Sequence, residues 1–147
     1  MPAVPWQHYI PDFAEQVQEG KELVAVDQLR PPSSTDRIKA VNQVHSWDKV
    51  NNNIVSALLK TLNTDPNVNV RLVTVETLSH FIGNPRVRQG LIRSIPTQVS
   101  PLVQLALADL MAGLQEKEAV PQFRELLEKK DLNYAVRDRI ESVVSML

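Results

Sequence analysis

The side chains most able to bind a metal in this chain are three histidines, His8, His45 and His80, since cysteine is absent. His45 and His80 fall near the C-terminal ends of the equivalent helices of two successive repeats, so we expect them to be near neighbours. A protein metal site needs further ligands at suitable geometry, and no H-x-x-x-H, H-E-x-x-H or acidic cluster accompanies these histidines. A histidine at a helix C-terminus is a favourable partner of the helix dipole. The sequence therefore predicts no metal site.

The carboxylates and hydroxyls give no pattern typical of catalysis. Glu76, Asp109, Glu116 and Glu118 are interspersed with lysines and arginines, whereas acid–base catalysis needs buried carboxylates at a fixed separation. The serines resemble caps and turns, with no G-x-S-x-G motif. The four glycines stand singly, so no phosphate-binding loop is expected. We expect no catalytic residue, no cofactor and no enzymatic activity.

The elements that carry these residues repeat with a period of about 33 residues. Four segments align, DRIKAVNQVHSW, VRLVTVETLSHF, VQLALADLMAGL and VRDRIESVVSML, whose first polar column is Arg37, Arg71, Gln104 and Arg137. Seven and ten residues later each copy has an apolar residue, which predicts two core columns. These columns are Val44, Leu78, Met111 and Val144, and Trp47, Phe81, Leu114 and Leu147.

A second helical pattern lies between the aligned segments. Ile54, Leu58 and Leu62 recur at helical spacing, and similar sets follow in VRQGLIRSI and AVPQFRELLEKK. Turn residues such as Asp65-Pro66-Asn67, Gly83-Asn84-Pro85 and Ser100-Pro101 separate the helices. The repeat region therefore predicts seven helices, near 35–46, 52–63, 68–82, 86–96, 100–113, 118–130 and 134–146.

Composition agrees with an all-α soluble domain. Apolar residues make up 43% and aromatic residues 5% of the 147 residues, which favours helices packed through aliphatic side chains. The net charge of −1 supplies no basic excess, so nucleic acid is not an expected partner. No apolar run reaches the roughly 18 residues needed to span a bilayer, and the N-terminus does not resemble a signal peptide. We therefore expect no membrane contact by this segment itself.

The turn Asp65-Pro66 followed by Val70-Arg71 resembles the HEAT family in its short, phycobilisome-lyase-type form, and Asp131, Val136 and Arg137 echo it. The resemblance covers roughly residues 34–147. It implies a right-handed α-α superhelix, a HEAT-like solenoid of about three and a half to four helical hairpins. It also implies a ladder between neighbouring repeats made by Asp65, Arg71, Asp131 and Arg137. Gln98 and Gln104 replace both partners in the third unit, where the ladder should be interrupted or neutral.

A narrower resemblance rests on DPNVNVRLVTVETL, NPRVRQGLIRSI, SPLVQLALADLM and LQEKEAVPQFRELL. These segments are similar to the C-terminal repeat domain of bacterial anti-sigma-factor-like single-pass membrane proteins. This resemblance implies an extracytoplasmic location, favoured over a cytoplasmic one, and tethering by a segment that this sequence does not contain.

Residues 1–33 do not fit the repeat. Prolines at 2, 5 and 11 and Gly20 predict an irregular, partly helical segment or linker before a repeat domain at 34–147. Leu23, Val24, Val26 and Leu29 could cap the open end of the stack, fill a groove, belong to a linker or pair with a second copy in a homodimer.

The candidate binding surface lies on the second helix of each hairpin, which lines the concave side of HEAT-like stacks. Positions one, four and five past the Arg/Gln column should face outward there, and several are apolar. Exposed contiguous apolar surface usually marks an interaction site, so we expect a non-enzymatic scaffold for a protein or peptide. The alternatives are that these residues pack between helices, that the chain is a bilin-lyase-like enzyme or subunit, or that it binds nucleic acid, which the charge disfavours. The candidate residues are Ile38, Val41, Leu72, Val75, Glu76, Leu105, Ala108 and Asp109.

Overall fold

The computed structural model describes residues 32–147, and this part of the chain is all-α, without strands. Residues 1–31 lie outside the described part of the chain. They include His8 and most of the predicted N-terminal segment 1–33, with its apolar residues Leu23, Val24, Val26 and Leu29. The α-helices are α3 (Ser34–His45), α4 (Asn52–Thr64), α5 (Val68–His80), α6 (Pro85–Ser94), α7 (Pro101–Leu114), α8 (Val120–Leu127) and α9 (Tyr134–Met146), with short 3-10 helices η1 (Ile95–Thr97) and η2 (Lys117–Ala119). The seven predicted helices are therefore confirmed.

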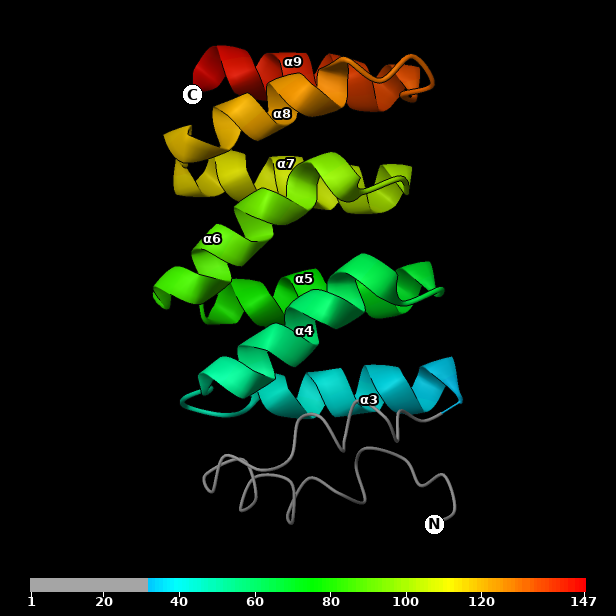
Figure 1. Cartoon of the computed structure of the whole chain (residues 1–147), viewed down its shortest axis with the longest axis vertical. Helices are drawn as coiled ribbons and strands as arrows, with labels where there is room; N and C mark the ends of the chain where they lie inside the picture. The colour runs from blue at the N-terminus through cyan, green and yellow to red at the C-terminus, as the bar shows by residue number, and fades with distance from the viewer. Residues whose placement is uncertain (1–31) are drawn as a thin grey trace.

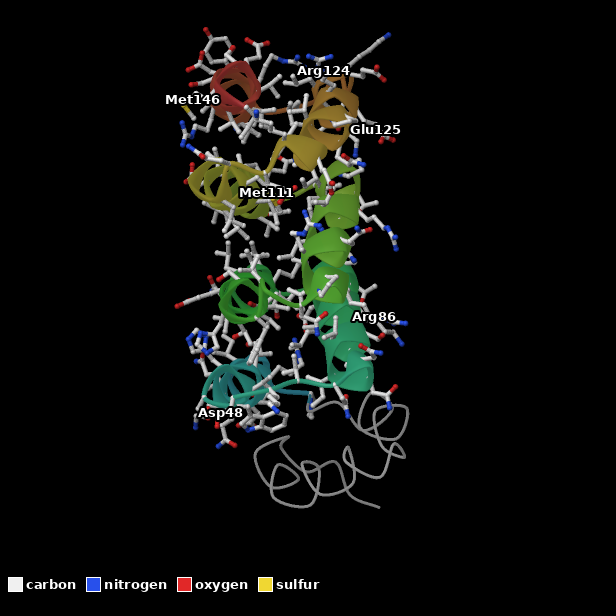
Figure 2. All side chains as sticks on the ribbon, turned by 90° about the vertical axis from the view of Figure 1, so that its left-hand side faces the viewer. Asp48, Arg86, Met111, Arg124, Glu125 and Met146 are labelled. Atoms are coloured by element: carbon white, nitrogen blue, oxygen red, sulfur yellow. The ribbon has the colours of Figure 1, made fainter. Side chains whose placement is uncertain are left out.

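The helices form two layers. One layer holds α3, α5, α7 and α9, each in contact with the next, and the other holds α4, α6 and α8 (Figures 1 and 2). Chain neighbours in opposite layers, such as α4 with α5 and α8 with α9, also pack together. The interior helix α5 thus packs against α3 and α7 on its two flanks and against α4 and α6 of the other layer. None of the helices between residues 32 and 147 combines the length and apolar character needed to cross a bilayer.

Asparagine side chains begin most of the helices. Asn51, Asn67, Asn84 and Asn133 each accept a hydrogen bond from a backbone N–H of the first helical turn. These bonds satisfy donors that have no partner within the helix. Proline takes the first position of α6 and α7, where its missing N–H costs no hydrogen bond. The turn residues identified in the sequence therefore lie where the helices begin.

Two helices are shorter than the sequence pattern predicts. The helix α6 ends at Ser94 and continues as η1, which contains Pro96. A proline lacks the N–H that the next α-helical turn requires. In α8 the α-helix begins only at Val120 and ends at Leu127, since η2 precedes it and the chain leaves the helix after Glu128.

The core runs continuously between the two layers. Of the first predicted core column, Val44, Leu78 and Met111 are buried, and Val144 is half-buried. Phe81 of the second column is also buried. Leu114 is 38% exposed, so its assignment to the core is wrong. The reason is that α7 ends there and Gln115 turns the chain in a left-handed conformation with φ 52°.

Trp47 and Leu147, the outer members of the second column, are half-buried and pack against the core. The alignment of the four repeats does not reveal the most deeply buried set of equivalent positions. This set lies three residues past the Arg/Gln positions. Its members are fully buried in all four units: Ala40, Thr74, Leu107 and Ile140.

Candidate protein-binding face

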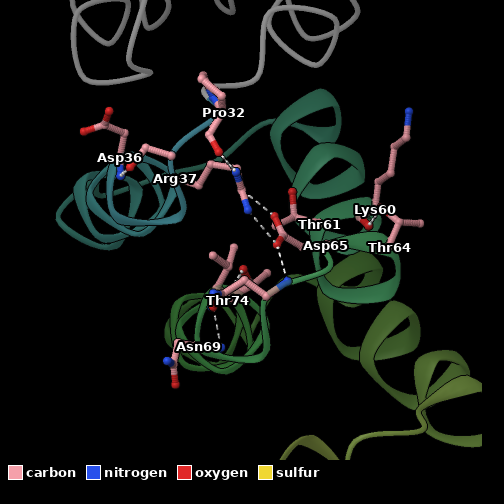
Figure 3. A network of polar contacts seen from close by, with 12 residues as sticks. Pro32, Asp36, Arg37, Lys60, Thr61, Thr64, Asp65, Asn69 and Thr74 are labelled. Carbon is pink, nitrogen blue, oxygen red and sulfur yellow. Dashed lines mark hydrogen bonds and ion pairs between the residues drawn. The ribbon is translucent and has the colours of Figure 1, made fainter.

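Polar side chains connect successive hairpins along the interior of the stack. The first connection joins Arg37 of α3 to Asp65, which follows α4 (Figure 3). Arg37 Nε donates to Asp65 Oδ2 at 2.8 Å and Nη2 donates to Oδ1 at 3.2 Å, and the carboxylate is completely buried. Arg37 also donates to the carbonyl of Pro32, and Asp65 accepts from the backbone N–H of Asn67. The pair is therefore bidentate and its buried carboxylate has further hydrogen bonding.

The second connection joins the equivalent positions through a neutral acceptor and a single hydrogen bond. Arg71 of α5 donates to the carbonyl of Leu62 and to Gln98 Oε1. Gln98 is fully buried, and its Nε2 donates to Asn63 Oδ1 at 2.9 Å. The ladder is therefore not interrupted at Gln98, because an amide supplies both an acceptor and a donor at that position.

The third connection is incomplete. Gln104 Nε2 donates back to the carbonyl of Gln98 at 2.8 Å, but no hydrogen bond joins Gln104 to Asp131 in the described part of the chain. Asp131 is exposed, and a pocket of about 330 Å³ lined by Gln104, Lys129 and Asp131 lies between them. Arg137, in the last unit, donates to the carbonyls of Leu127 and Lys129. Asp131 and Arg137 thus make no ion pair or hydrogen bond with each other in the described structure.

Three of the predicted surface residues are not on the surface. Val41, Val75 and Ala108 are 1%, 5% and 0% exposed. Each lies four residues past the Arg/Gln column, one position from the fully buried column of Ala40, Thr74 and Leu107. An interior helix of the first layer packs against neighbours on both flanks, so its buried stripe is wide enough to include both positions. Their assignment to an open groove is wrong.

The other predicted residues remain accessible to different degrees. Ile38, Leu72 and Leu105 are half-buried, and the two leucines pack against the core. Glu76 and Asp109 are exposed, and Asp109 Oδ1 accepts from Arg139 Nε of α9 at 2.9 Å. The outward stripe of α5 and of α7 is therefore apolar on one edge and has a carboxylate at its centre.

Three apolar residues on the same stripe were missed. Val73 and Ala106 are half-buried, and Leu102 is 54% exposed. The signal in the sequence is that PLVQLALADLMAGL has apolar residues all around the helix, more than burial in a two-layer stack requires. We define the outward face as the stripe of α5 and α7 formed by Leu72, Val73, Glu76, Leu102, Leu105, Ala106 and Asp109.

The two histidines predicted to be neighbours are indeed stacked. The ring centroids of His45 and His80 are 4.5 Å apart with an interplanar angle of 23°, and His80 also meets Phe81 edge-on. They lie in the last turns of α3 and α5, where a helix dipole favours positive charge. Within residues 32–147, no group of three or more histidine, aspartate or glutamate side chains is arranged to hold a metal ion.

Comparisons with known proteins give no assignment. No family model matches the sequence, and no curated protein or solved structure matches it significantly.

Proposed function

We propose that this chain is a non-enzymatic protein-binding scaffold, a HEAT-like right-handed superhelix whose outward face receives a segment of a partner protein. The observation that carries the proposal is the exposure of Leu102 on this face, beside other aliphatic side chains. Leu102 is 54% exposed beside half-buried Leu105 and Ala106. Aliphatic surface that gathers on one face of a folded domain usually marks an interaction site.

The superhelical reading is supported by the repeated connections between hairpins. Arg37 contacts the turn residue Asp65, and Arg71 contacts Gln98, the corresponding turn residue one repeat later. Such nearest-neighbour contacts are typical of repeat proteins, in which each unit packs only on the next. Repeat proteins of this architecture commonly bind partners along an extended face.

The chemistry of the outward face suggests the kind of partner. Glu76 and Asp109 occupy equivalent positions 33 residues apart on α5 and α7, with leucines beside both. A partner segment with aliphatic side chains flanked by lysine or arginine would complement this face. The narrower resemblance extends the proposal to a sensory or assembly domain of a membrane-tethered regulator. That extension rests on the resemblance alone.

Charge placed on the outward face tests the proposal. In Leu102→Glu and Ala106→Glu, single or combined, we expect proteins captured from an extract of the native source to be lost. Helicity should be retained, because Leu102 is 54% exposed and Ala106 is only half-buried, and positions open to solvent tolerate charge. Tyr134→Glu is the matched control, since Tyr134 is 84% exposed near the start of α9 and outside the outward face.

The measurement is quantitative mass spectrometry of captured proteins, with circular dichroism to verify the fold. Proteins retained by wild type and by Tyr134→Glu, but lost with the outward-face variants, would support the proposal. A capture profile that the folded outward-face variants leave unchanged would contradict it.

A further inference from the structure

A second surface lies in the other layer, in a pocket of about 490 Å³ between α4 and α6. Its apolar floor comes from Val55 and Leu59 of α4, and Arg86, Gln89 and Arg93 of α6 border it. Val55 is buried and Leu59 half-buried, whereas Arg86 and Arg93 are exposed. Figure 2 shows Arg86 pointing away from the first layer, toward solvent. The pocket thus combines an aliphatic floor with a cationic border.

Glycine at position 90 allows close packing of α4 against α6 beside this pocket. A Cβ built on Gly90 would lie 2.3 Å from Cδ1 of Leu59, far closer than two carbon atoms can approach. The absence of a side chain at position 90 therefore allows Leu59 to lie directly against the α6 backbone. Leu59 remains half-buried there and forms part of the lining.

The two helices around the pocket carry charge of one sign only. They contain Lys60, Arg86, Arg88 and Arg93, and neither contains an aspartate or a glutamate. Arg88 is bound by Glu116 and Glu118. Within residues 32–147, the one side-chain hydrogen bond of Arg93 is long, 3.5 Å from Nη2 to Gln89 Oε1. Arg86 and Arg93 thus present guanidinium groups to solvent on the border of the pocket.

From this complementarity we propose that the pocket binds an acidic segment of a partner protein, with an aliphatic side chain on Leu59 and carboxylates on Arg86 and Arg93. The two arginines are seven residues apart, about 10 Å along the helix axis. That separation suits two carboxylates of one short segment better than a single small anion. Guanidinium groups bind carboxylates with paired hydrogen bonds.

A nucleic acid would complement the positive charge of the pocket border but not its aliphatic floor. Proteins that bind single strands combine a long cationic track with aromatic rings on which bases stack. The lining of this pocket contains no aromatic residue, and its exposed cations number only two. An aliphatic floor favours a leucine-like side chain over a base, so the peptide is the occupant that we propose.

This inference does not depend on the outward face, because the pocket belongs to the opposite layer. A variant that abolishes capture through Leu102 should leave peptide binding unchanged. Failure of one proposal is therefore distinguishable from failure of the other.

Fluorescence anisotropy with the full chain tests the proposal. The probe is a fluorescein-labelled peptide of about ten residues, an extended length of roughly 33 Å, with equal numbers of glutamate and leucine. We expect wild type to bind it at low ionic strength and added salt to weaken binding, since exposed charges are screened. Combined Arg86→Glu and Arg93→Glu should lower the affinity by about ten-fold or more, which is about 1.4 kcal/mol.

The matched control is Arg124→Glu, which reverses an exposed arginine on α8 in the same layer (Figure 2). We expect it to change the affinity by less than about two-fold, and a peptide with glutamine in place of glutamate should not bind. Four results would overturn the proposal: no binding at low salt, an equal loss with Arg124→Glu, tighter binding of an oligonucleotide of the same length, or a dimer in sedimentation that the double variant dissociates. The last would identify a second copy as the occupant.

Discussion

At the scale of single residues, the arginines of the stack bind in two directions. Arg37 and Arg71 each donate backward to a main-chain carbonyl and forward to the turn of the next hairpin. A planar guanidinium suits this use because its donors point in fixed, divergent directions. Gln104 is shorter and has one donor group, so it reaches only the backward carbonyl, that of Gln98. The connection to Asp131 is missing for this reason.

Restoring the missing connection should stabilise the protein. We expect Gln104→Arg to raise the free energy of unfolding by about 0.2–1 kcal/mol, the range for a solvent-accessible ion pair. The new guanidinium can enter the pocket of about 330 Å³ beside Asp131 and keep the bond to the Gln98 carbonyl. Lys129 also lines this pocket. Because its positive charge would repel the new arginine, we expect the gain in unfolding free energy to be small.

Urea denaturation of four proteins measures this effect: wild type, Gln104→Arg, Asp131→Asn and the double variant. The gain should disappear when Asp131→Asn is present, because the pairwise term is then removed. An equal gain in both backgrounds would mean that the arginine acts without Asp131.

At the scale of elements, the end of α7 is the one strained point in the described backbone. Gln115 has φ 52°, the left-handed region, and is the only non-glycine residue of the described chain with positive φ. The backbone N–H of Glu116 donates to the carbonyl of Met111 across this turn, which closes the helix. Glycine is the residue that normally occupies this position, because a Cβ there is unfavourable.

Replacing Gln115 by glycine should therefore stabilise the protein by about 1 kcal/mol, the cost of a left-handed conformation less the entropy that glycine adds to the unfolded chain. Thermal and urea unfolding followed by circular dichroism measure the change. Gln115→Ala is the control and should leave stability nearly unchanged, because it keeps the Cβ. A loss of stability with glycine would show that the Gln115 side chain makes a contribution larger than the strain.

The sequence predicted the helices well and their exposed faces less well. Asn67 and Asn84 each cap a helix through a hydrogen bond to a residue two or three positions later. Because this interaction is local, the residue type alone predicts the helix start. Which side of α5 or α7 faces solvent depends on contacts with two flanking helices and a second layer, and these are not local. Val75 and Ala108 were therefore placed outside although they are buried, and Leu102 was overlooked although it is exposed.

At the scale of the whole molecule, the two layers present different chemistry. The outward face of the first layer offers aliphatic side chains beside Glu76 and Asp109, whereas the pocket in the second layer is bordered by Arg86 and Arg93. A stack of this kind can bind two different segments at once, because each layer has its own solvent-facing side (Figure 2). The two proposals therefore concern separate surfaces and can be tested separately.

Site-specific photo-crosslinking tests the scaffold proposal most directly. A benzoylphenylalanine is placed at Ala106, on the outward face, and in a second protein at Glu125, an exposed position of α8 (Figure 2). Both proteins are irradiated in an extract of the native source, and crosslinked products are identified by mass spectrometry. The proposal predicts a defined crosslinked partner from position 106 and none of the same identity from position 125. The same partner crosslinked from position 125 and not from position 106 would contradict it.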